Sequence, residues 1–263
     1  MRGQPCRVIP MLPEVVVDAH DHLDCVVLQI RGRLSHRGNV WVRRSIAKSL
    51  ADNGRVLIDL SRLHCSQACF LMVFPAALAA AGGWPWGRLV LFGADTAVQS
   101  ALASERISET VPLAADFTSA HTLLDRRPPQ VRRHRDLPGH PSAAAGARML
   151  VREACAAWSV PHDLGQDAEL VANELVSNAV LHAHTSSRLT LTYTGAMLRV
   201  AVRDYRPCPA PIRPRPIDID APHGRGLHLV ATLAKTWCVD RHPDGKTVWA
   251  TLALDSPSQA KQQ

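Results

Sequence analysis

The feature that most constrains this chain is a helix-forming stretch at residues 168–184, AELVANELVSNAVLHAH. Glu-Leu-Val-x-Asn occurs twice in succession within it, and neither glycine nor proline interrupts it. We therefore expect a single helix. Each residue of an α-helix turns the chain by about 100°, so the two copies point about 140° apart. Only one copy can face a given ligand.

The second copy is the better candidate for a site. Glu174 and Asn178 lie one turn apart and about 40° around the helix axis, so both side chains can reach one ligand. Glu169, in the first copy, lies with Asp167 near the expected helix start, where acidic residues favour the positive end of the helix dipole.

Glu174 has no such explanation, because it falls in the middle of the helix. Its direction is within about 60° of three apolar side chains, those of Leu170, Val171 and Leu181. We expect its carboxylate to be held against an apolar surface, which is unfavourable without a function or a partner. A pairing with a basic residue across a domain surface is the alternative interpretation from the helix alone.

The length of 263 residues, 46% of them hydrophobic, favours two globular domains. The longest apolar run, residues 69–84, is shorter than the roughly 18–20 residues that cross a bilayer, and it contains a proline. A signal peptide is not expected at the N-terminus, since no sustained apolar core precedes a small-residue cleavage site. These features predict a cytoplasmic protein without a membrane segment.

Charge and cysteine content exclude little by themselves. The formal charge is +7, and arginines concentrate at residues 126–135 without aromatic or zinc-finger patterns, which favours a solvated linker over a nucleic-acid-binding arm. The seven cysteines contain no CxxC pair, which argues against a disulfide framework. His64, Cys65 and Cys69 lack a fourth ligand at the usual zinc spacing, so a metal is not expected there.

The first half alternates strand-like and helix-like segments, a β-α-β-α-β series. Strands are expected at residues 25–30, 56–60 and 89–92, with helices at 39–51 and after Cys69. A further helix at 116–125 leads into Pro128 and Pro129, which break regular structure. We therefore place an N-terminal domain at residues 14–125 and a basic Pro/Arg-rich linker at 126–131.

The second half, residues 132–254, predicts an α/β sandwich with helices on one face of a mostly antiparallel sheet. A helix at 142–159 precedes the doubled motif. Two strands at 188–194 and 197–204, a helix at 224–234 and a final strand pair at 236–241 and 246–254 follow.

Several later residues suit a nucleotide. Asp204 ends a strand, where its carboxylate can accept a hydrogen bond from an adenine amino group. Gly224 and Gly226 open a helix, where the backbone can approach phosphates. Asn178 offers a carbonyl oxygen suited to Mg²⁺, and Glu174 can act as a general base. Each signal is weak alone, but in this order and spacing the set is specific.

Four segments in this order, ELVSNAVLHA, VAVRDYRP, HGRGLHLV and GKTVWATL, resemble the GHKL-type ATPase domain of bacterial anti-sigma factor serine kinases. The resemblance covers about residues 132–254. It implies ATP and Mg²⁺ as cofactors, with Glu174 as catalytic base and Asn178 as the Mg²⁺ ligand. The other cofactor-binding residues that it implies are the adenine contact Asp204, its supporting Thr247, the phosphate lid of Gly224, Arg225, Gly226 and Leu227, and His182.

One departure from the family pattern affects the expected ATP affinity. Where many relatives carry Asp-x-Gly-x-Gly, this chain has Asp204 followed by Tyr-Arg-Pro-Cys. A loop without glycine approaches a nucleotide base less readily. This departure predicts low affinity for ATP.

The first half resembles a STAS domain, the fold of anti-sigma factor antagonists, through VLIDLSRLHCSQACFLM at residues 56–72. In phosphorylatable relatives Asp-Ser-Ser-Gly begins the helix after this strand, and its second serine accepts phosphate. Here the matching positions hold Gln67, Ala68, Cys69 and Phe70, so the phosphoacceptor is missing. Ser66 lies nearby but one step ahead of the motif.

The resemblance implies a partner-switching regulator of bacterial transcription, with a STAS antagonist or a sigma factor as partner. Three functions stay open: an ATP-dependent serine/threonine protein kinase, a non-catalytic docking regulator with or without nucleotide, and a nucleic-acid binder that uses the arginines. A homodimer and docking of the STAS-like half onto the kinase-like half of the same chain are further expectations.

Overall fold

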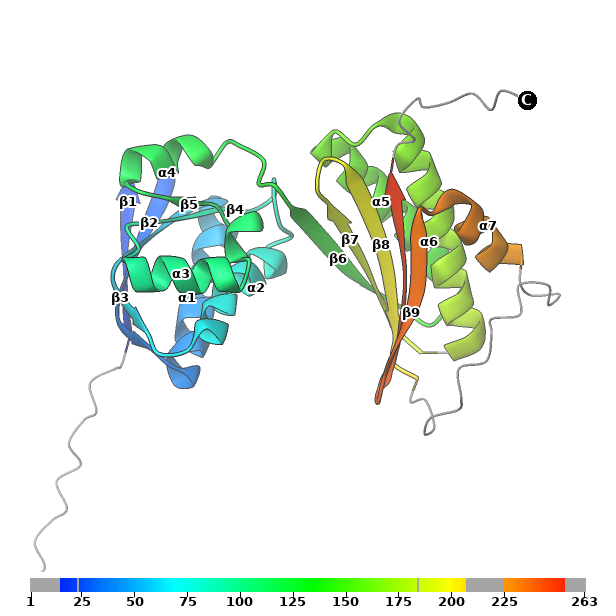
Figure 1. Cartoon of the computed structure of the whole chain (residues 1–263), viewed down its shortest axis with the longest axis horizontal. Helices are drawn as coiled ribbons and strands as arrows, with labels where there is room; N and C mark the ends of the chain where they lie inside the picture. The colour runs from blue at the N-terminus through cyan, green and yellow to red at the C-terminus, as the bar shows by residue number, and fades with distance from the viewer. Residues whose placement is uncertain (1–14, 23, 184, 207–224, 254–263) are drawn as a thin grey trace, which may run out of the picture. The chain divides into compact units, whose positions relative to one another are not determined.

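A computed structural model describes residues 15–22, 24–183, 185–206 and 225–253. Contacts divide the chain into two compact units (Figure 1). Unit 1 comprises Met1–Ala81 and Trp86–Arg126, and unit 2 comprises Gly82–Pro85 and Arg127–Gln263. Within the described ranges, no helix combines the length and the hydropathy that a membrane span requires.

Unit 1 is built on a five-stranded sheet of order β1-β2-β3-β4-β5, in which β1 is antiparallel to β2 and the other neighbours are parallel. Its elements are β1 (Val15–His22), β2 (Cys25–Leu34), α1 (His36–Asn53), β3 (Arg55–Cys65), the 3-10 helix η1 (Ala68–Met72), α2 (Val73–Ala80), β4 (Arg88–Phe92), α3 (Thr96–Ser104), the 3-10 helix η2 (Ile107–Glu109), β5 (Leu113–Ala114) and α4 (Phe117–Leu123).

Both faces of this sheet are covered. Alternate residues of β3 and β4 enter two apolar clusters: Val56 and Ile58 pack with α1, α2 and α3, whereas Leu57 and Val90 pack with α4. Burial on both faces explains the continuous apolar runs of these strands, since parallel strands lie between helices. The predicted β-α-β-α-β series is confirmed, with β1 added at its edge.

Unit 2 is a two-layer sandwich. Its sheet has the order β6-β7-β8-β10-β9 with every neighbouring pair antiparallel, and α5, α6 and α7 cover one face (Figure 1). The predicted α/β sandwich is confirmed. Its elements are β6 (Val131–Leu137), α5 (Ala143–Trp158), α6 (His162–Ala183), β7 (Ser187–Tyr193), β8 (Met197–Asp204), α7 (Arg225–Leu233), β9 (Thr236–His242) and β10 (Gly245–Ala253).

The core of unit 2 holds α6 in a fixed position. Leu175 and Val176 of α6 are 2% and 0% exposed and lie in one cluster with Leu150 of α5 and Val200 of β8. Burying each such side chain contributes about 1.5–3 kcal/mol. The doubled motif is therefore carried by a helix that packs against α5 and the sheet, which fixes the direction of both copies.

Strand β6 was not expected, because its sequence VRRHRDL is dominated by charge. Val131 and Leu137 are buried, and the arginines between them on the same face reach Glu153 of α5, from Arg133 at 3.1 Å and from Arg135 at 3.4 Å. The interpretation of the arginine segment as a solvated linker is therefore wrong for Arg133 and Arg135. Both form ion pairs with Glu153 inside unit 2.

Candidate functional site

The first copy of the repeated motif faces α5. Glu169 forms a two-bond pair with Arg152, with distances of 2.5 and 2.8 Å. The Asn173 amide oxygen accepts a bond of 2.6 Å from Arg148. The helix dipole is therefore not the main reason for an acidic residue at position 169. Both polar side chains of this copy are engaged by arginines one turn apart on the neighbouring helix.

The second copy faces the start of α7. A Cβ added to Gly226 would lie 2.4 Å from Glu174 Oε2 and 3.7 Å from Glu174 Cβ. Such a distance is below any normal contact, so a side chain at position 226 would displace the end of Glu174 from the first turn of α7. Asn178 lies one turn further along α6 and is half-buried, as is Glu174. Among the described residues, the Asn178 side chain has no hydrogen-bond partner.

A hydrogen-bonded chain links the two copies. Arg148 donates to the Asn173 oxygen, and the Asn173 amide nitrogen donates to Glu174 Oε1 at 3.4 Å. Arginine cannot accept a hydrogen bond, which fixes the orientation of the amide. The first copy therefore supports one oxygen of Glu174, while the other oxygen lies toward Gly226. Neither Arg148 nor Asn173 was singled out from the sequence.

The expected apolar surface around Glu174 is only partly present. Val171 is fully buried, but Leu170 and Leu181 are 48% and 61% exposed. Both leucines lie on the same side of α6 as Glu174, as the residue spacing predicts, but this side of the helix points away from the core. Glu174 is thus a half-buried carboxylate at the α6–α7 contact.

Asp204 is a buried carboxylate at the end of β8, with 3% exposure. The backbone N–H of Arg206 donates to its Oδ1 at 3.3 Å, and the Lys246 ammonium lies 3.8 Å from its Oδ2. Gly245 allows the start of β10 to lie close to the end of β8, because a Cβ at this position would be 2.1 Å from the Asp204 backbone oxygen. Lys246 is a neighbour of Asp204 that the sequence analysis did not anticipate.

The expected support of Asp204 by Thr247 is not found. In the β8–β10 ladder Lys246 is opposite Asp204 and Thr247 is opposite Arg203. Opposite residues of an antiparallel pair share a face and successive residues alternate, so Thr247 lies on the other side of the sheet. There it contacts His242 Nε2 at 3.1 Å. Lys246 takes the position expected for Thr247.

The structure describes only part of the segment that was expected to form the phosphate lid. Helix α7 begins at Arg225, whose side chain lies outside the described atoms, as does the whole of Gly224. Leu227 is half-buried and packs against the core of unit 2, so its side chain has a structural role. His182 lies in the last turn of α6, and its side chain is also outside the described part.

The described residues of this region have the functional groups that a magnesium-bound nucleotide requires. Glu174 and Asn178 present hard oxygen atoms on one face of α6, and Mg²⁺ prefers oxygen ligands. The Gly226 backbone beside them has no side chain to obstruct a phosphate, and backbone N–H groups at a helix start favour anions. Asp204 offers a buried acceptor for an amino group.

The region of unit 1 that matches the phosphoacceptor motif lies at the start of η1. Cys69 and Ser66 are exposed there, and the Cys69 thiol lies 3.8 Å from the Gln67 side-chain oxygen. Both side chains are accessible to solvent. At the position that the sequence analysis matches to the acceptor serine, the accessible nucleophile is the thiol of Cys69.

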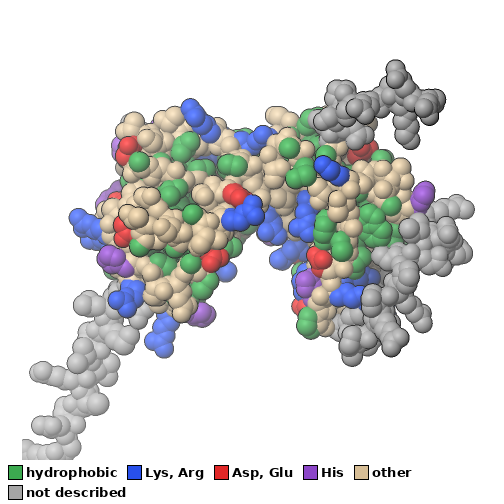
Figure 2. Space-filling view, viewed as in Figure 1, with side chains coloured by type: hydrophobic (Ala, Val, Ile, Leu, Met, Phe, Trp, Pro, Cys, Tyr) green, Lys and Arg blue, Asp and Glu red, His purple; other side chains and the backbone are tan. Residues whose placement is uncertain are grey.

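Three of the five clustered arginines contact groups of unit 2. Besides the two on β6 that meet Glu153, Arg127 donates to the Trp158 backbone oxygen at 2.7 Å and lies 5.0 Å from the centre of the Tyr193 ring. On the visible face of unit 1, basic side chains are dispersed among acidic and uncharged ones (Figure 2). These contacts give the three arginines a structural role within unit 2, whereas Arg132 lies with Arg188, Arg199 and Arg203 on the outer face of its sheet.

The C-terminal region is similar to a known protein family. Residues 137–252 match the family of histidine kinase-like ATPase domains. No curated protein matches the chain.

Solved structures resemble parts of the chain. An anti-sigma factor antagonist from Mycobacterium paratuberculosis is 19% identical, over 43% of this chain and 97% of its own, with a TM-score of 0.38. The RsbU and RsbW domains of a Mycobacterium tuberculosis protein are 20% identical, over 61% of this chain and 44% of theirs, with a TM-score of 0.37. A histidine kinase domain from Erythrobacter litoralis is 22% identical, over 44% of this chain and 61% of its own, with a TM-score of 0.28.

Proposed function

We propose that the protein is an ATP-dependent serine/threonine protein kinase of the anti-sigma type, because residues 137–252 match the family of histidine kinase-like ATPase domains. It would regulate bacterial transcription in the cytoplasm by partner switching, with a STAS antagonist on another chain as substrate. The observation that carries the proposal is the direct approach of Gly226 to the Glu174 carboxylate, one turn from Asn178.

Glu174 and Asn178 of the second copy each have a role in this proposal. Bound Mg²⁺ neutralises phosphate charge, and Asn178 would hold it through its amide oxygen. Glu174 would orient the substrate hydroxyl and take its proton as the oxygen bonds to the γ-phosphorus of ATP and ADP leaves. The Asn173 amide would keep the Glu174 carboxylate in place.

The remaining nucleotide contacts come from other elements of unit 2. Asp204 would accept a hydrogen bond from the adenine amino group, and its burial favours this role because a buried acceptor discriminates strongly. The start of α7, including Arg225 and Gly226, would cover the phosphates together with Gly224. Thr247 and Leu227 are left out of this assignment because of where their side chains lie.

We further propose that unit 1 acts as a STAS-like element that cannot be phosphorylated at the family position, where Cys69 and its neighbours replace the serine motif. Tethering raises the effective concentration of such a unit to the millimolar range for a short linker. It would compete in cis for the surface that the kinase half offers to a sigma factor or an antagonist. A homodimer is compatible with this arrangement.

A second candidate function is a regulator that binds partners but transfers no phosphate. The observation that favours it is the Lys246 ammonium beside Asp204. An adenine amino group would have to share this carboxylate with a lysine, on a loop that lacks glycine after Asp204. Weak or absent ATP binding would follow.

Phosphate transfer separates the two functions. The full chain would be incubated with γ-labelled ATP and STAS proteins that carry the serine motif, beside the Glu174→Gln variant. The kinase proposal expects label on the STAS serine, and loss of label in the variant. ATP binding without transfer to any STAS protein would favour the docking regulator.

A further inference from the structure

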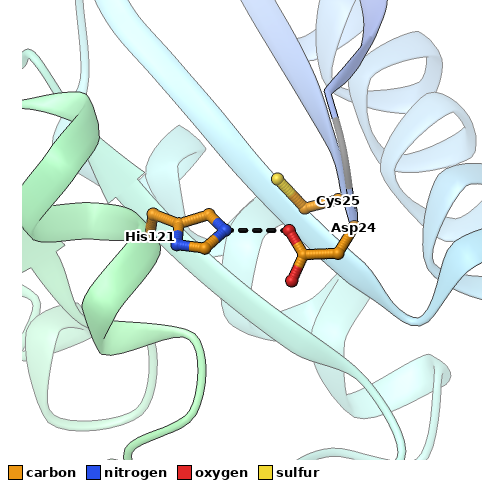
Figure 3. A group of neighbouring side chains, drawn as sticks. All are labelled: Asp24, Cys25 and His121. Atoms are coloured by element: carbon orange, nitrogen blue, oxygen red, sulfur yellow. Dashed lines mark hydrogen bonds and ion pairs between the residues drawn. The ribbon is translucent and has the colours of Figure 1, made fainter.

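Three side chains of different chemistry meet in unit 1, far from the nucleotide residues in sequence: Asp24, Cys25 and His121 (Figure 3). A carboxylate oxygen, a thiol sulfur and an imidazole nitrogen, one from each residue, all lie within 4.8 Å of one another. None of these residues has a role in the proposed kinase function.

The fold of unit 1 fixes this group. Asp24 precedes β2, and Cys25 is the first residue of β2, opposite His22 of β1. Helix α4 brings His121 to the same place, because Ala120 and Leu124 are buried in one apolar cluster with Cys25. Core packing on either side of His121 therefore sets its position relative to the thiol, before any ligand arrives.

A hydrogen bond and an ion pair orient the Asp24 carboxylate. His121 Nε2 lies 2.8 Å from Asp24 Oδ1, while Arg55 holds the other oxygen, Oδ2, at 2.9 Å. Arg55 also pairs with Asp125 at 2.6 Å, which balances much of its charge. One carboxylate oxygen thus faces the imidazole and the thiol, and the second is fixed by an arginine, as outer partners fix the ligands of many metal sites.

The ordinary alternative is an ion pair between Asp24 and His121 with an unrelated buried cysteine. Such a pair, with the Asp24 and His121 side chains 52% and 36% exposed, contributes little to stability. The pairing explains the 2.8 Å contact. It does not explain why a third ligand atom of a different kind lies at the same point.

We infer that Asp24, Cys25 and His121 bind one zinc ion. Zinc accepts thiolate, imidazole and carboxylate ligands together at four-coordinate sites, and water can complete the fourth position. A hard cation such as Mg²⁺ would not use the thiol, so the mixed ligand set favours a borderline-soft metal. Binding requires the Cys25 thiol to lose its proton to solvent and the His121 imidazole to be neutral.

Zinc here would join the β1–β2 turn to α4, at the opposite end of β2 and β3 from η1 and its Cys69. A ligand that binds only the folded state stabilises it in proportion to its occupancy. We therefore expect zinc to raise the melting temperature of the metal-free protein, and magnesium at the same concentration to leave this site empty.

Calorimetric titration of the metal-free full chain with Zn²⁺ tests the inference. One equivalent should bind to the wild type and be lost in Cys25→Ala, His121→Asn and Asp24→Asn. Two controls should keep it: Cys69→Ala removes an exposed thiol elsewhere, and His22→Asn removes a histidine whose ring packs on Phe117 at 4.7 Å beside the group.

Cobalt provides a second readout that does not depend on stability. Co²⁺ bound through Cys25 should show a thiolate-to-metal absorption band that Cys25→Ala removes and Cys69→Ala retains. Circular dichroism identifies any variant that fails to fold, and Asp24→Asn is the least disruptive because Asp24 is exposed. Unchanged zinc stoichiometry in the three ligand variants, or no zinc binding by the wild type, would overturn the inference.

Discussion

The two copies of Glu-Leu-Val-x-Asn have the same residues and opposite surroundings. Glu169 and Asn173 of the first copy are bound by Arg152 and Arg148 of α5, whereas Glu174 of the second copy lies against the first turn of α7. A shift of five residues along one helix separates them. The comparison teaches that a motif becomes a candidate site through the element it faces, and that the other copy can serve as its support.

The largest difference between the copies is expected in phosphate transfer. Glu174→Gln removes the proposed base and should reduce the rate about 10²–10⁴-fold, because a positioned general base contributes that much. Glu169→Gln should leave the rate within about threefold and cost at most ~1 kcal/mol, since it weakens an exposed ion pair. Transfer from γ-labelled ATP and urea unfolding measure the two effects. Equal loss of transfer in both variants would contradict the assignment.

The contact between Glu174 and α7 can be broken from the other side. Gly226→Ala places a methyl group 2.4 Å from Glu174 Oε2 and should lower transfer about 10²-fold by displacing the carboxylate. Gly165→Ala is the matched control within α6, because its Cβ would meet only Cys155 at 3.6 Å, an ordinary contact. This control should be neutral or stabilise the protein by up to ~1 kcal/mol. A fully active Gly226→Ala protein would separate α7 from the site.

The proposed nucleotide site also includes Asp204 on the sheet, and removal of this carboxylate is expected to weaken ATP binding. Asp204→Asn should lower affinity about 10–100-fold, the equivalent of one hydrogen bond to a charged group. Asp244→Asn is the control, because that exposed carboxylate pairs with Arg203 at 2.7 Å. Calorimetric titration with ATP compares them. Equal affinities in the two variants would place the adenine elsewhere.

The smallest expected effect tests whether the first copy supports the second. Arg148→Ala releases Asn173 and should lower kcat up to about tenfold while KM for ATP is unchanged, since only orientation of the base is affected. Arg148→Lys should restore part of the loss. Arg152→Ala, on the same helix, removes the Glu169 pair instead and should leave kcat unchanged. A shift in the pH profile of kcat for Arg148→Ala alone would identify the positioning role.

The sequence could predict that the two copies face different neighbours, because the directions of side chains on a helix depend only on residue spacing. Most strands and helices were predictable for the same reason, from periodicity. The position of Thr247 was not, because a one-residue difference in the β8–β10 register moves a side chain to the opposite face. Strand β6 was hidden because its inward positions hold Arg133 and Arg135, whose partner Glu153 is on a helix.

Binding of Mg-ATP to the wild type, Asn178→Ala and Asn173→Ala, measured by calorimetry, tests the comparison most directly. The two variants remove the same side chain from the same motif on the same helix. We expect the wild type to bind and Asn178→Ala to lose binding. Asn173→Ala should bind within about threefold of the wild type, because Asn173 contacts the catalytic base Glu174 and not the nucleotide. Loss of binding in both variants, or retention in both, would contradict the assignment of the site to the second copy.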